Sequence, residues 1–195
     1  MTLALFLAHY HVPTILVERN PRTTTHPKMD LTNGRSMELY RKIDLVDKLR
    51  AAGVPGDNPF DIVWLTNMVG HELHRFAYPS SNESAAAAAA ENDGTHTAES
   101  AIRVSQIVIE PVFKAAIDAA PLIDVRFNTR FERIISSDDD GVVAEIVDNE
   151  SGRAEQIRCQ YLAGCDGGGS RVRRHLGIDL DGDLGVAAAY MVHFR

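Results

Sequence analysis

The stretch Thr14-Ile15-Leu16-Val17-Glu18 decides the fold, because four apolar or β-branched residues run without interruption into an acid. A continuous run of this kind is typical of a strand that is covered on both faces, as in a parallel sheet. The almost wholly apolar residues 2–11 predict a short helix before it, which Pro13 ends. A helix that leads into a buried strand indicates an α/β fold built on a parallel sheet.

Glu18 occupies a place that has a specific meaning in a Rossmann-like βαβ unit. There a glycine loop joins the first strand to a helix, and about 20 residues later an acid at the end of the second strand binds ribose hydroxyls. Counting back from Glu18 passes Met1, so we expect the glycine loop and the first strand to be missing from this chain. The alternative is that Glu18 is a solvated charge, since many α/β domains show the same pattern.

The rest of the chain alternates predicted helices and strands. Apolar residues at helical spacing predict helices over 34–52, with a break near Asp44, and over 106–119 and 171–176. Apolar or alternating runs predict strands over 61–68, 72–78, 125–135, 142–148, 154–160, 161–165 and 185–194. Gly70 and the run Asp138-Asp139-Asp140-Gly141 mark two turns.

Residues 79–99 have low complexity, with six consecutive alanines over 85–90 between polar segments. Such a composition is typical of a mobile surface insertion. We expect the alanines to form one or two helical turns with no partner face.

The overall composition is that of an ordinary globular protein, with 45% hydrophobic and 24% charged residues among 195. A formal net charge of −7 repels phosphate backbones, so we expect no nucleic-acid partner. No apolar run reaches the roughly 18 residues that span a bilayer, so we expect no membrane segment. Cys159, Cys165 and the eight histidines lack metal-ligand spacing, which favours a reduced, cytoplasmic protein without a metal site.

A second pattern lies at residues 165–173, Cys-Asp-Gly-Gly-Gly-Ser-Arg-Val-Arg, between a predicted strand and a predicted helix. The glycines allow close approach of the backbone, and amide groups at a helix start can face an anion. Asp166 stands where ligands bind in open α/β sheets and can accept hydrogen bonds from sugar or ribityl hydroxyls. The alternative is a flexible turn in which Ser170 is an ordinary N-cap.

Four segments, taken in order, resemble the FAD-dependent aromatic hydroxylases of the para-hydroxybenzoate hydroxylase type, with phenol and chlorophenol hydroxylases nearest. They are Val17-Glu18-Arg19, Asn33 to Glu38, Ser105-Gln106 with Glu110-Pro111, and Ala163 to Arg173. The similarity covers essentially the whole chain apart from the alanine-rich segment. It implies a flavoprotein monooxygenase that uses FAD and NAD(P)H to hydroxylate a small aromatic, phenol-like substrate.

The resemblance also implies roles for single residues. Glu18 matches the acid that binds the adenosine ribose of FAD, and Arg19 lies near the same ribose or the adenine. Arg35 matches an arginine close to the flavin pyrophosphate that also helps to place the nicotinamide cofactor. Gln106 matches a glutamine that contacts FAD at a helix start, and Asp166 matches the aspartate tied to both FAD and NAD(P)H. No catalytic residue is assigned, because the cofactor carries the chemistry.

The resemblance further divides the chain into parts. Residues 1–59 and 100–180 match the FAD-binding domain, 60–99 match substrate-domain strands with the low-complexity insertion, and 181–195 match the start of the substrate-domain sheet. Arg173 closes the Asp166 motif and supports it structurally. The family's glycine loop and its later Gly-Asp segment have no counterpart, so we expect a chain truncated at both ends.

Two alternatives to an active hydroxylase stay open. The first is a non-catalytic remnant that acts as a binding or interaction module. The second is a related flavoprotein such as a halogenase or a reductase, since those use acids in the same way as Glu18 and Asp166. A homodimer is the default expectation for the oligomeric state.

Overall fold

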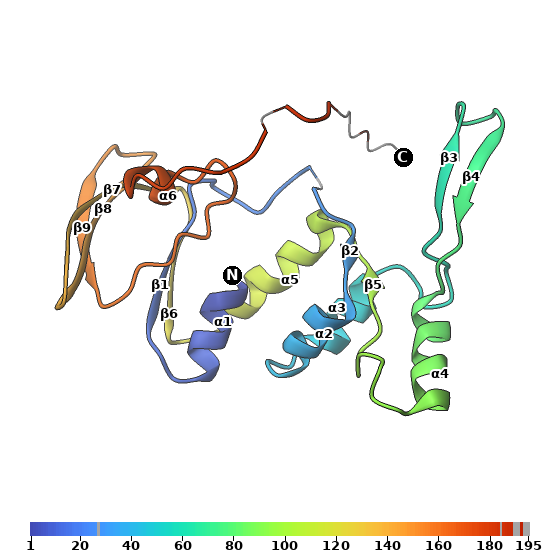
Figure 1. The fold of residues 1–195 in the computed structure, drawn as a ribbon. Helices are drawn as coiled ribbons and strands as arrows, with labels where there is room; N and C mark the ends of the chain where they lie inside the picture. The colour runs from blue at the N-terminus through green and yellow to red at the C-terminus, as the bar shows by residue number, and fades with distance from the viewer. Residues whose placement is uncertain (27, 184, 189–191, 193–195) are drawn as a thin grey trace. The chain divides into compact units, whose positions relative to one another are not determined.

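A computed structural model describes residues 1–26, 28–183, 185–188 and 192 of the chain (Figure 1). The chain divides into two compact units. The first comprises Met1–Val12 and Thr23–Ala120, and the second comprises Pro13–Arg22 and Pro121–Arg195.

Helices and short strands make up the first unit, and strands dominate the second. The first unit contains α1 (Thr2–His9), β2 (Leu31–Thr32), α2 (Gly34–Arg41), α3 (Val46–Ala52), β3 (Ile62–Leu65), β4 (Glu72–Phe76), α4 (Ser81–Glu91), β5 (Ile102–Arg103) and α5 (Gln106–Asp118). The second contains β1 (Thr14–Val17), β6 (Ile123–Arg126), β7 (Thr129–Asp138), β8 (Gly141–Asp148), β9 (Ala154–Cys159) and α6 (Arg171–His175). None of the helices in the described ranges combines the length and hydrophobicity that a bilayer crossing requires.

Helices α2, α3 and α5 enclose the core of the first unit. Met37 of α2, Leu49 of α3 and Phe113 of α5 belong to one buried cluster, and the first two are fully buried. The helix predicted over 34–52 is broken as expected, because Asp44 has a φ of 56° in the left-handed region, which no α-helix accommodates. The break turns α3 so that its apolar side packs on α5.

The alanines are helical as expected, but the helix is longer than the one or two turns predicted, and its start is buried, unlike that of a loose insertion. Helix α4 has 11 residues and starts with a capping box, in which Ser80 and Glu83 each satisfy the other's N–H. Ser80 and Ser81 are buried, and the hydroxyl of Ser81 donates to the carbonyl of Ala101. The alanine run therefore extends a helix whose first turn is attached to the rest of the unit.

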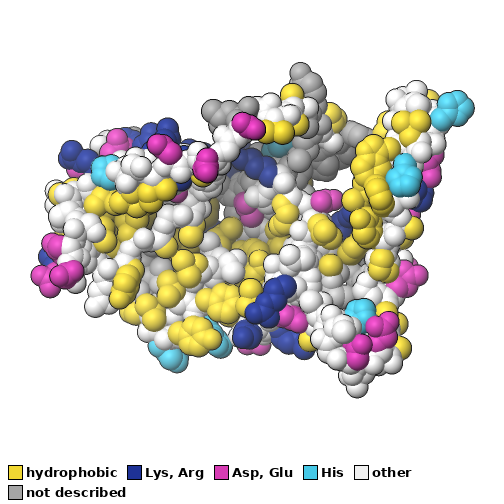
Figure 2. All heavy atoms as spheres, in the orientation of Figure 1, with side chains coloured by type: hydrophobic (Ala, Val, Ile, Leu, Met, Phe, Trp, Pro, Cys, Tyr) yellow, Lys and Arg dark blue, Asp and Glu magenta, His cyan; other side chains and the backbone are white. Residues whose placement is uncertain are grey.

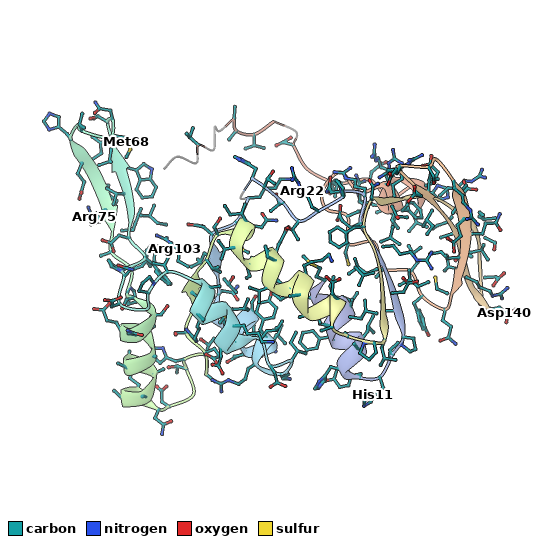
Figure 3. The ribbon with its side chains drawn as sticks, turned by 180° about the vertical axis from the view of Figure 1, so that it is seen from behind. His11, Arg22, Met68, Arg75, Arg103 and Asp140 are labelled. Carbon is teal, nitrogen blue, oxygen red and sulfur yellow. The ribbon has the colours of Figure 1, made fainter. Side chains whose placement is uncertain are left out.

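The predicted hairpin around Gly70 is confirmed as the antiparallel pair β3–β4. Trp64 and Phe76 meet across the strands with ring centroids 5.0 Å apart, yet each side chain stays about half exposed. Figure 2 shows hydrophobic side chains gathered along this hairpin. Arg75, labelled in Figure 3, pairs with Asp61 over 2.8 Å and with Glu72 over 2.7 Å, which stiffens the hairpin.

The second unit contains the predicted parallel pairing. Strand β1 runs parallel to β6 from Thr14 opposite Ile123 to Val17 opposite Arg126, which confirms a mixed α/β fold. The strand is only partly covered, since Ile15 is 39% exposed. Strands β7, β8 and β9 form a separate antiparallel sheet, and Asp140 lies in the predicted β7–β8 turn (Figure 3).

Two strand predictions in this unit need correction, and a third falls partly outside the described residues. The strand predicted over 125–135 is two strands, because Asn128 adopts a φ of 56° between β6 and β7. Residues 161–165 form no strand, and Tyr161 is 89% exposed; no described segment pairs with them, and a strand requires a hydrogen-bonded neighbour. Half of the strand predicted over 185–194 lies outside the described residues, and its described part, 185–188 and 192, has no strand.

Candidate functional site

Glu18 directly follows β1 and continues its parallel ladder. Its N–H donates to the carbonyl of Arg126 over 2.9 Å. The carboxylate oxygen Oε1 accepts from the N–H and from the side-chain amide of Asn20, each over 2.7 Å. Among the described residues the other oxygen, Oε2, has no partner. The half-buried carboxylate is thus held in place while one oxygen remains available to a donor.

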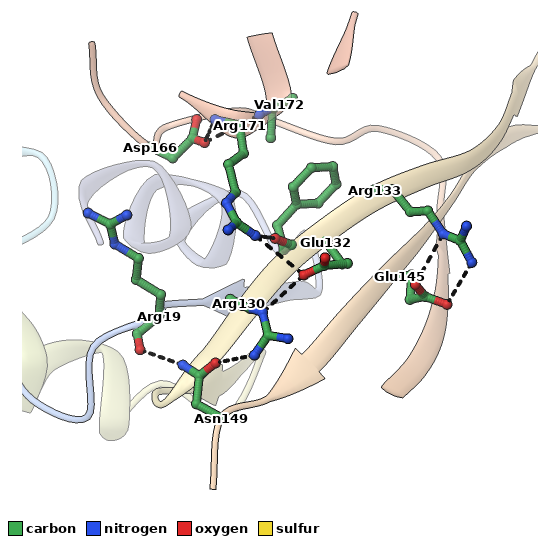
Figure 4. Close-up of polar contacts among 10 residues, drawn as sticks. Arg19, Arg130, Glu132, Arg133, Glu145, Asn149, Asp166, Arg171 and Val172 are labelled. Atoms are coloured by element: carbon green, nitrogen blue, oxygen red, sulfur yellow. Dashed lines mark hydrogen bonds and ion pairs between the residues drawn. The ribbon is translucent and has the colours of Figure 1, made fainter. Parts of the chain in front are cut away.

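Three consecutive carbonyl groups after β1 each accept one hydrogen bond from the strands and turns around β7–β9. The carbonyl of Glu18 accepts from the N–H of Thr129 over 2.9 Å, and the carbonyl of Asn20 accepts from the N–H of Asn128 over 2.9 Å. Between them, the carbonyl of Arg19 accepts from Nδ2 of Asn149 over 2.8 Å. Of these three hydrogen bonds, the one to the carbonyl of Arg19 alone has a side-chain donor. The guanidinium of Arg19 points away from this contact (Figure 4), and the residue is exposed.

Asp166 lies in the loop before α6 and binds the first turn of that helix. Its Oδ2 accepts from the N–H of Arg171 over 2.6 Å and from the N–H of Val172 over 3.3 Å, and its Oδ1 accepts from the hydroxyl of Ser170. Burial alone would raise the pKa of this carboxyl, but the three hydrogen bonds favour the charged form and lower the pKa below its ordinary value. The side chain therefore acts as a helix anchor.

The glycines around Asp166 differ in what they allow. At Gly164 a methyl group would lie 2.9 Å from Cβ of Val172, so only glycine permits this close packing of the loop on α6. At Gly168 and Gly169 a methyl group would meet no atom of the described residues within 4 Å. Gly167 has a φ of 78°, a conformation that favours glycine. The glycine run thus forms a turn with an open outer side.

Arg173, inside α6, contacts the start of the helix through its backbone and the segment after the helix through its side chain. Its N–H donates to the Ser170 hydroxyl over 2.9 Å, which confirms Ser170 as the N-cap. Its guanidinium donates to the carbonyl of Ile178 and so closes the chain turn that follows the helix at Gly177. The side-chain contact lies after the helix and the contact with Ser170 uses only the backbone, so the supporting role that the resemblance implies for Arg173 stays a prediction.

A chain of polar contacts connects the segment after β1 with the loop of Asp166 (Figure 4). Oδ1 of Asn149 accepts from Nη1 of Arg130 over 2.7 Å, and Nε of Arg130 donates to Glu132 over 3.0 Å. Nη1 of Arg171 donates to the same Glu132 oxygen over 3.3 Å. Because the N–H of Arg171 binds Asp166, the contacts are continuous from one loop to the other.

The residues that make this connection, Asn149, Arg130 and Glu132, are not among the site residues that the sequence predicts. Arg130 and Glu132 lie on either side of Phe131 in the predicted strand, and charged residues two positions apart indicate no more than a solvated sheet face. Both side chains are more than a third exposed. The Arg130 guanidinium beside Glu132 holds the pKa of that carboxyl below its ordinary value. No sequence signal distinguishes this pair from an ordinary surface ion pair.

Gln106, in the first unit, begins α5 and binds a segment distant in sequence. Its N–H donates to the carbonyl of Met29 over 2.9 Å, and its Oε1 accepts from the N–H of Lys28 over 2.8 Å. Its Nε2 donates to Glu110 over 2.6 Å, and the other oxygen of Glu110 accepts from the N–H of Thr24 over 2.7 Å. Both ends of the Gln106 amide are thus occupied by the chain itself.

Arg35 lies in the first turn of α2 with its side chain 70% exposed. It pairs with Glu38 over 2.9 Å, and the other Glu38 oxygen accepts from the N–H of Ala98 over 2.8 Å. Arg35 first, and then Ala98, lower the pKa of the Glu38 carboxyl. At Gly34 a methyl group would collide with the carbonyl oxygen of Glu99, so this helix start requires glycine.

The sequence-predicted residues thus fall into two groups. Glu18, Arg19 and Asp166 belong to the second unit, where polar contacts connect them. Arg35 and Gln106 belong to the first unit, on α2 and α5.

Comparisons with known proteins agree with one another. A family model described as an FAD binding domain matches residues 1–195. The FAD-dependent monooxygenase apdD of Emericella nidulans is 35% identical over 193 residues, which cover 98% of this chain and 31% of that protein. The 2,4-dichlorophenol 6-monooxygenase of Delftia acidovorans is 32% identical over 193 residues, which cover 98% of this chain and 32% of that protein.

A solved structure extends the similarity to the fold. The flavin-dependent monooxygenase PieE, in complex with FAD and substrate, matches with a TM-score of 0.82 and 31% identity. The match covers 95% of this chain and 31% of that one. The chain therefore spans about a third of the length of the relatives that it matches.

Proposed function

The chain belongs to the FAD-binding monooxygenase family that includes the phenol and chlorophenol hydroxylases, and from this premise we propose that it is the FAD-binding part of an NAD(P)H-dependent enzyme that hydroxylates a small aromatic, phenol-like substrate. The observation that carries the proposal is the carboxylate of Glu18, held at the carboxyl end of a parallel strand with one oxygen available. An acid in that place suits the vicinal hydroxyls of a ribose.

The side chains present fit FAD in two different ways. Glu18 offers an acceptor, and the exposed guanidinium groups of Arg19 and Arg35 suit the adenosine end and the pyrophosphate. Gln106 and Asp166 are engaged with backbone groups of their own chain, so they fit a positioning role. The proposal therefore assigns direct polar contacts to the first three and loop support to the other two.

Hydride acceptance from NAD(P)H and the activation of oxygen are chemistry that FAD supplies once it is bound. The chain's residues bind and orient. Glu18 would accept hydrogen bonds from the ribose, and Arg35 would balance the charge of the pyrophosphate. Asp166 would keep the start of α6 and its open glycine turn in place beside the cofactor.

A titration of the 195-residue chain with FAD tests the proposal, with flavin fluorescence as the readout. We expect saturable binding, and about tenfold or greater weakening in Glu18→Ala, because hydrogen bonds to a charged group contribute about 1.5–3 kcal/mol. Asp139→Ala removes an exposed acid from the β7–β8 turn and should leave the affinity unchanged. Wild-type protein that leaves the fluorescence unaltered, or an affinity unchanged by Glu18→Ala, would contradict the proposal.

The reaction is tested on a protein of the relatives' full length that contains this sequence. We expect NAD(P)H oxidation, stimulated by phenols, to yield a hydroxylated ring. A chlorinated product would favour a halogenase instead. A colourless, flavin-free protein would favour the non-catalytic interaction module.

A further inference from the structure

The segment 18–20 depends on one distant side chain, Asn149. We infer that Asn149 is a positioning residue for the carboxylate of Glu18, an inference that rests on the proposed function. Its Nδ2 donates to the carbonyl of Arg19 over 2.8 Å, although the two residues are 130 positions apart. The neighbouring carbonyls in this segment are bound by backbone N–H groups.

The contact acts on Glu18 through a single peptide group. The carbonyl of Arg19 and the N–H of Asn20 belong to the same planar peptide unit and point in opposite directions. Asn149 binds the carbonyl end, and Oε1 of Glu18 binds the N–H end over 2.7 Å. Rotation of this peptide plane would withdraw the N–H from the carboxylate. Asn149 therefore sets the orientation of the group that holds Glu18.

Asn149 itself is fixed by its turn. Oδ1 of Asp148 accepts from the N–H groups of Glu150 and Ser151 over 3.1 and 2.7 Å, which builds a tight turn between β8 and β9. The N–H of Asn149 donates to the carbonyl of Asn128 over 2.8 Å. The backbone that carries the amide is therefore held on both sides.

Arg130 decides which way the amide of Asn149 faces. A guanidinium has donors only, so its contact with Asn149 over 2.7 Å requires the amide oxygen. The amide nitrogen is then the atom that faces the carbonyl of Arg19. Arg130 is in turn oriented by Glu132, over 3.0 Å. A flipped amide would set two donors against each other and two acceptors against each other.

Two variants of Asn149 separate its contacts. Asn149→Asp keeps an acceptor for Arg130 but turns an oxygen toward the carbonyl of Arg19, and Asn149→Ala removes both contacts. Arg133→Ala is the matched control, because among the described residues Arg133 pairs with Glu145, which lies on the same sheet (Figure 4). Amide hydrogen exchange of Asn20 in the ligand-free chain and FAD affinity are measured on all three.

We expect Asn149→Asp and Asn149→Ala to speed exchange of the Asn20 amide and to weaken FAD binding, each about two- to tenfold, as loss of one neutral hydrogen bond predicts. Arg133→Ala should change neither. The inference would be overturned if the Asn20 amide exchanged as slowly in Asn149→Asp as in the wild type. It would also be overturned if Arg133→Ala changed exchange and FAD affinity as much as the Asn149 variants do. Loss of protection throughout the second unit would overturn it as well, since that marks general destabilisation.

The two measurements, Asn20 amide exchange and FAD affinity, distinguish a failure of this inference from a failure of the proposed function. If wild-type protein binds no FAD, the proposed function fails, and exchange of the Asn20 amide still decides whether Asn149 orients the peptide. If wild-type protein binds FAD and the Asn149 variants bind it equally well, the inference fails while the proposed function stands.

Discussion

The carboxylate of Glu99 lies 2.6 Å from Nη2 of Arg50, although the two residues are 49 positions apart. Its other oxygen lies 2.6 Å from Nε of Arg41, and the acid's side chain is only 7% exposed. The segment 79–99, whose composition suggests a loose insertion, thus ends in a buried acid that joins it to α2 and α3. A buried charge with two partners is costly to disturb, because removal of the acid leaves its partners without a counter-charge.

Glu99→Gln should therefore lower the stability of the first unit. A neutral amide keeps the shape but loses both ion pairs, and we expect a loss of about 1–3 kcal/mol in the free energy of unfolding. Urea unfolding monitored by the single tryptophan, Trp64, provides the measurement. Glu91→Gln is the control: its partner is His96 and its side chain is 56% exposed, so less than about 0.5 kcal/mol is expected. Equal losses in the two variants would contradict the prediction.

Glu99 should also make the stability of the protein depend on pH. Burial raises the pKa of Glu99, but the hydrogen bonds from Arg50 and Arg41 outweigh it, so the folded pKa lies below the ordinary value of 4.5. A carboxyl with a lowered folded pKa stabilises the protein above its unfolded pKa and loses this contribution as the pH falls through the folded pKa. We expect wild-type stability to decline from about pH 5 downward, and the Glu99→Gln variant to decline less. Parallel curves would show that Glu99 does not contribute.

Elements whose signals are local could be predicted from the sequence. The helix over 106–119 and the turn at residues 138–141 follow from spacing and turn residues within a few positions. The apolar residues 161–165 have the composition of a strand, but a strand also needs a neighbour, and none of the described segments provides one. Pairing is a property of two segments, so the composition of one cannot establish it.

The candidate site likewise contains residues that local sequence signals predict and residues that they do not. Glu18 could be placed at a strand end because the strand and the acid are adjacent in the sequence. Asn149 could not be found, since an asparagine next to a glycine-containing turn is explained by turn formation alone. For Gln106 the position at a helix start and its i,i+4 partner Glu110 could be predicted, but its partner Lys28, in a distant segment, could not.

The close packing of Gly164 on Val172 predicts a sharp difference between two glycines of one loop. Gly164→Ala would place a methyl group 2.9 Å from a branched side chain, so we expect a loss of about 1–3 kcal/mol in the stability of the second unit. Gly168→Ala adds a methyl group to open space and should change stability by less than about 0.5 kcal/mol. Thermal unfolding by circular dichroism compares the two. A neutral Gly164→Ala would show that α6 does not pack as described.

Gln106→Ala should release the segment that contains Lys28 without abolishing FAD binding. The variant loses the acceptor for the N–H of Lys28 and the donor to Glu110, which itself holds the N–H of Thr24. Trypsin cuts after lysine, so the rate of cleavage at Lys28 reports on this release, and we expect about a two- to tenfold increase. Gln156→Ala, on β9, should leave that rate unchanged. Because both ends of the Gln106 amide are occupied, FAD affinity should fall less than in Glu18→Ala. Unaltered cleavage together with an equal loss of FAD affinity would instead assign Gln106 a direct contact with the cofactor.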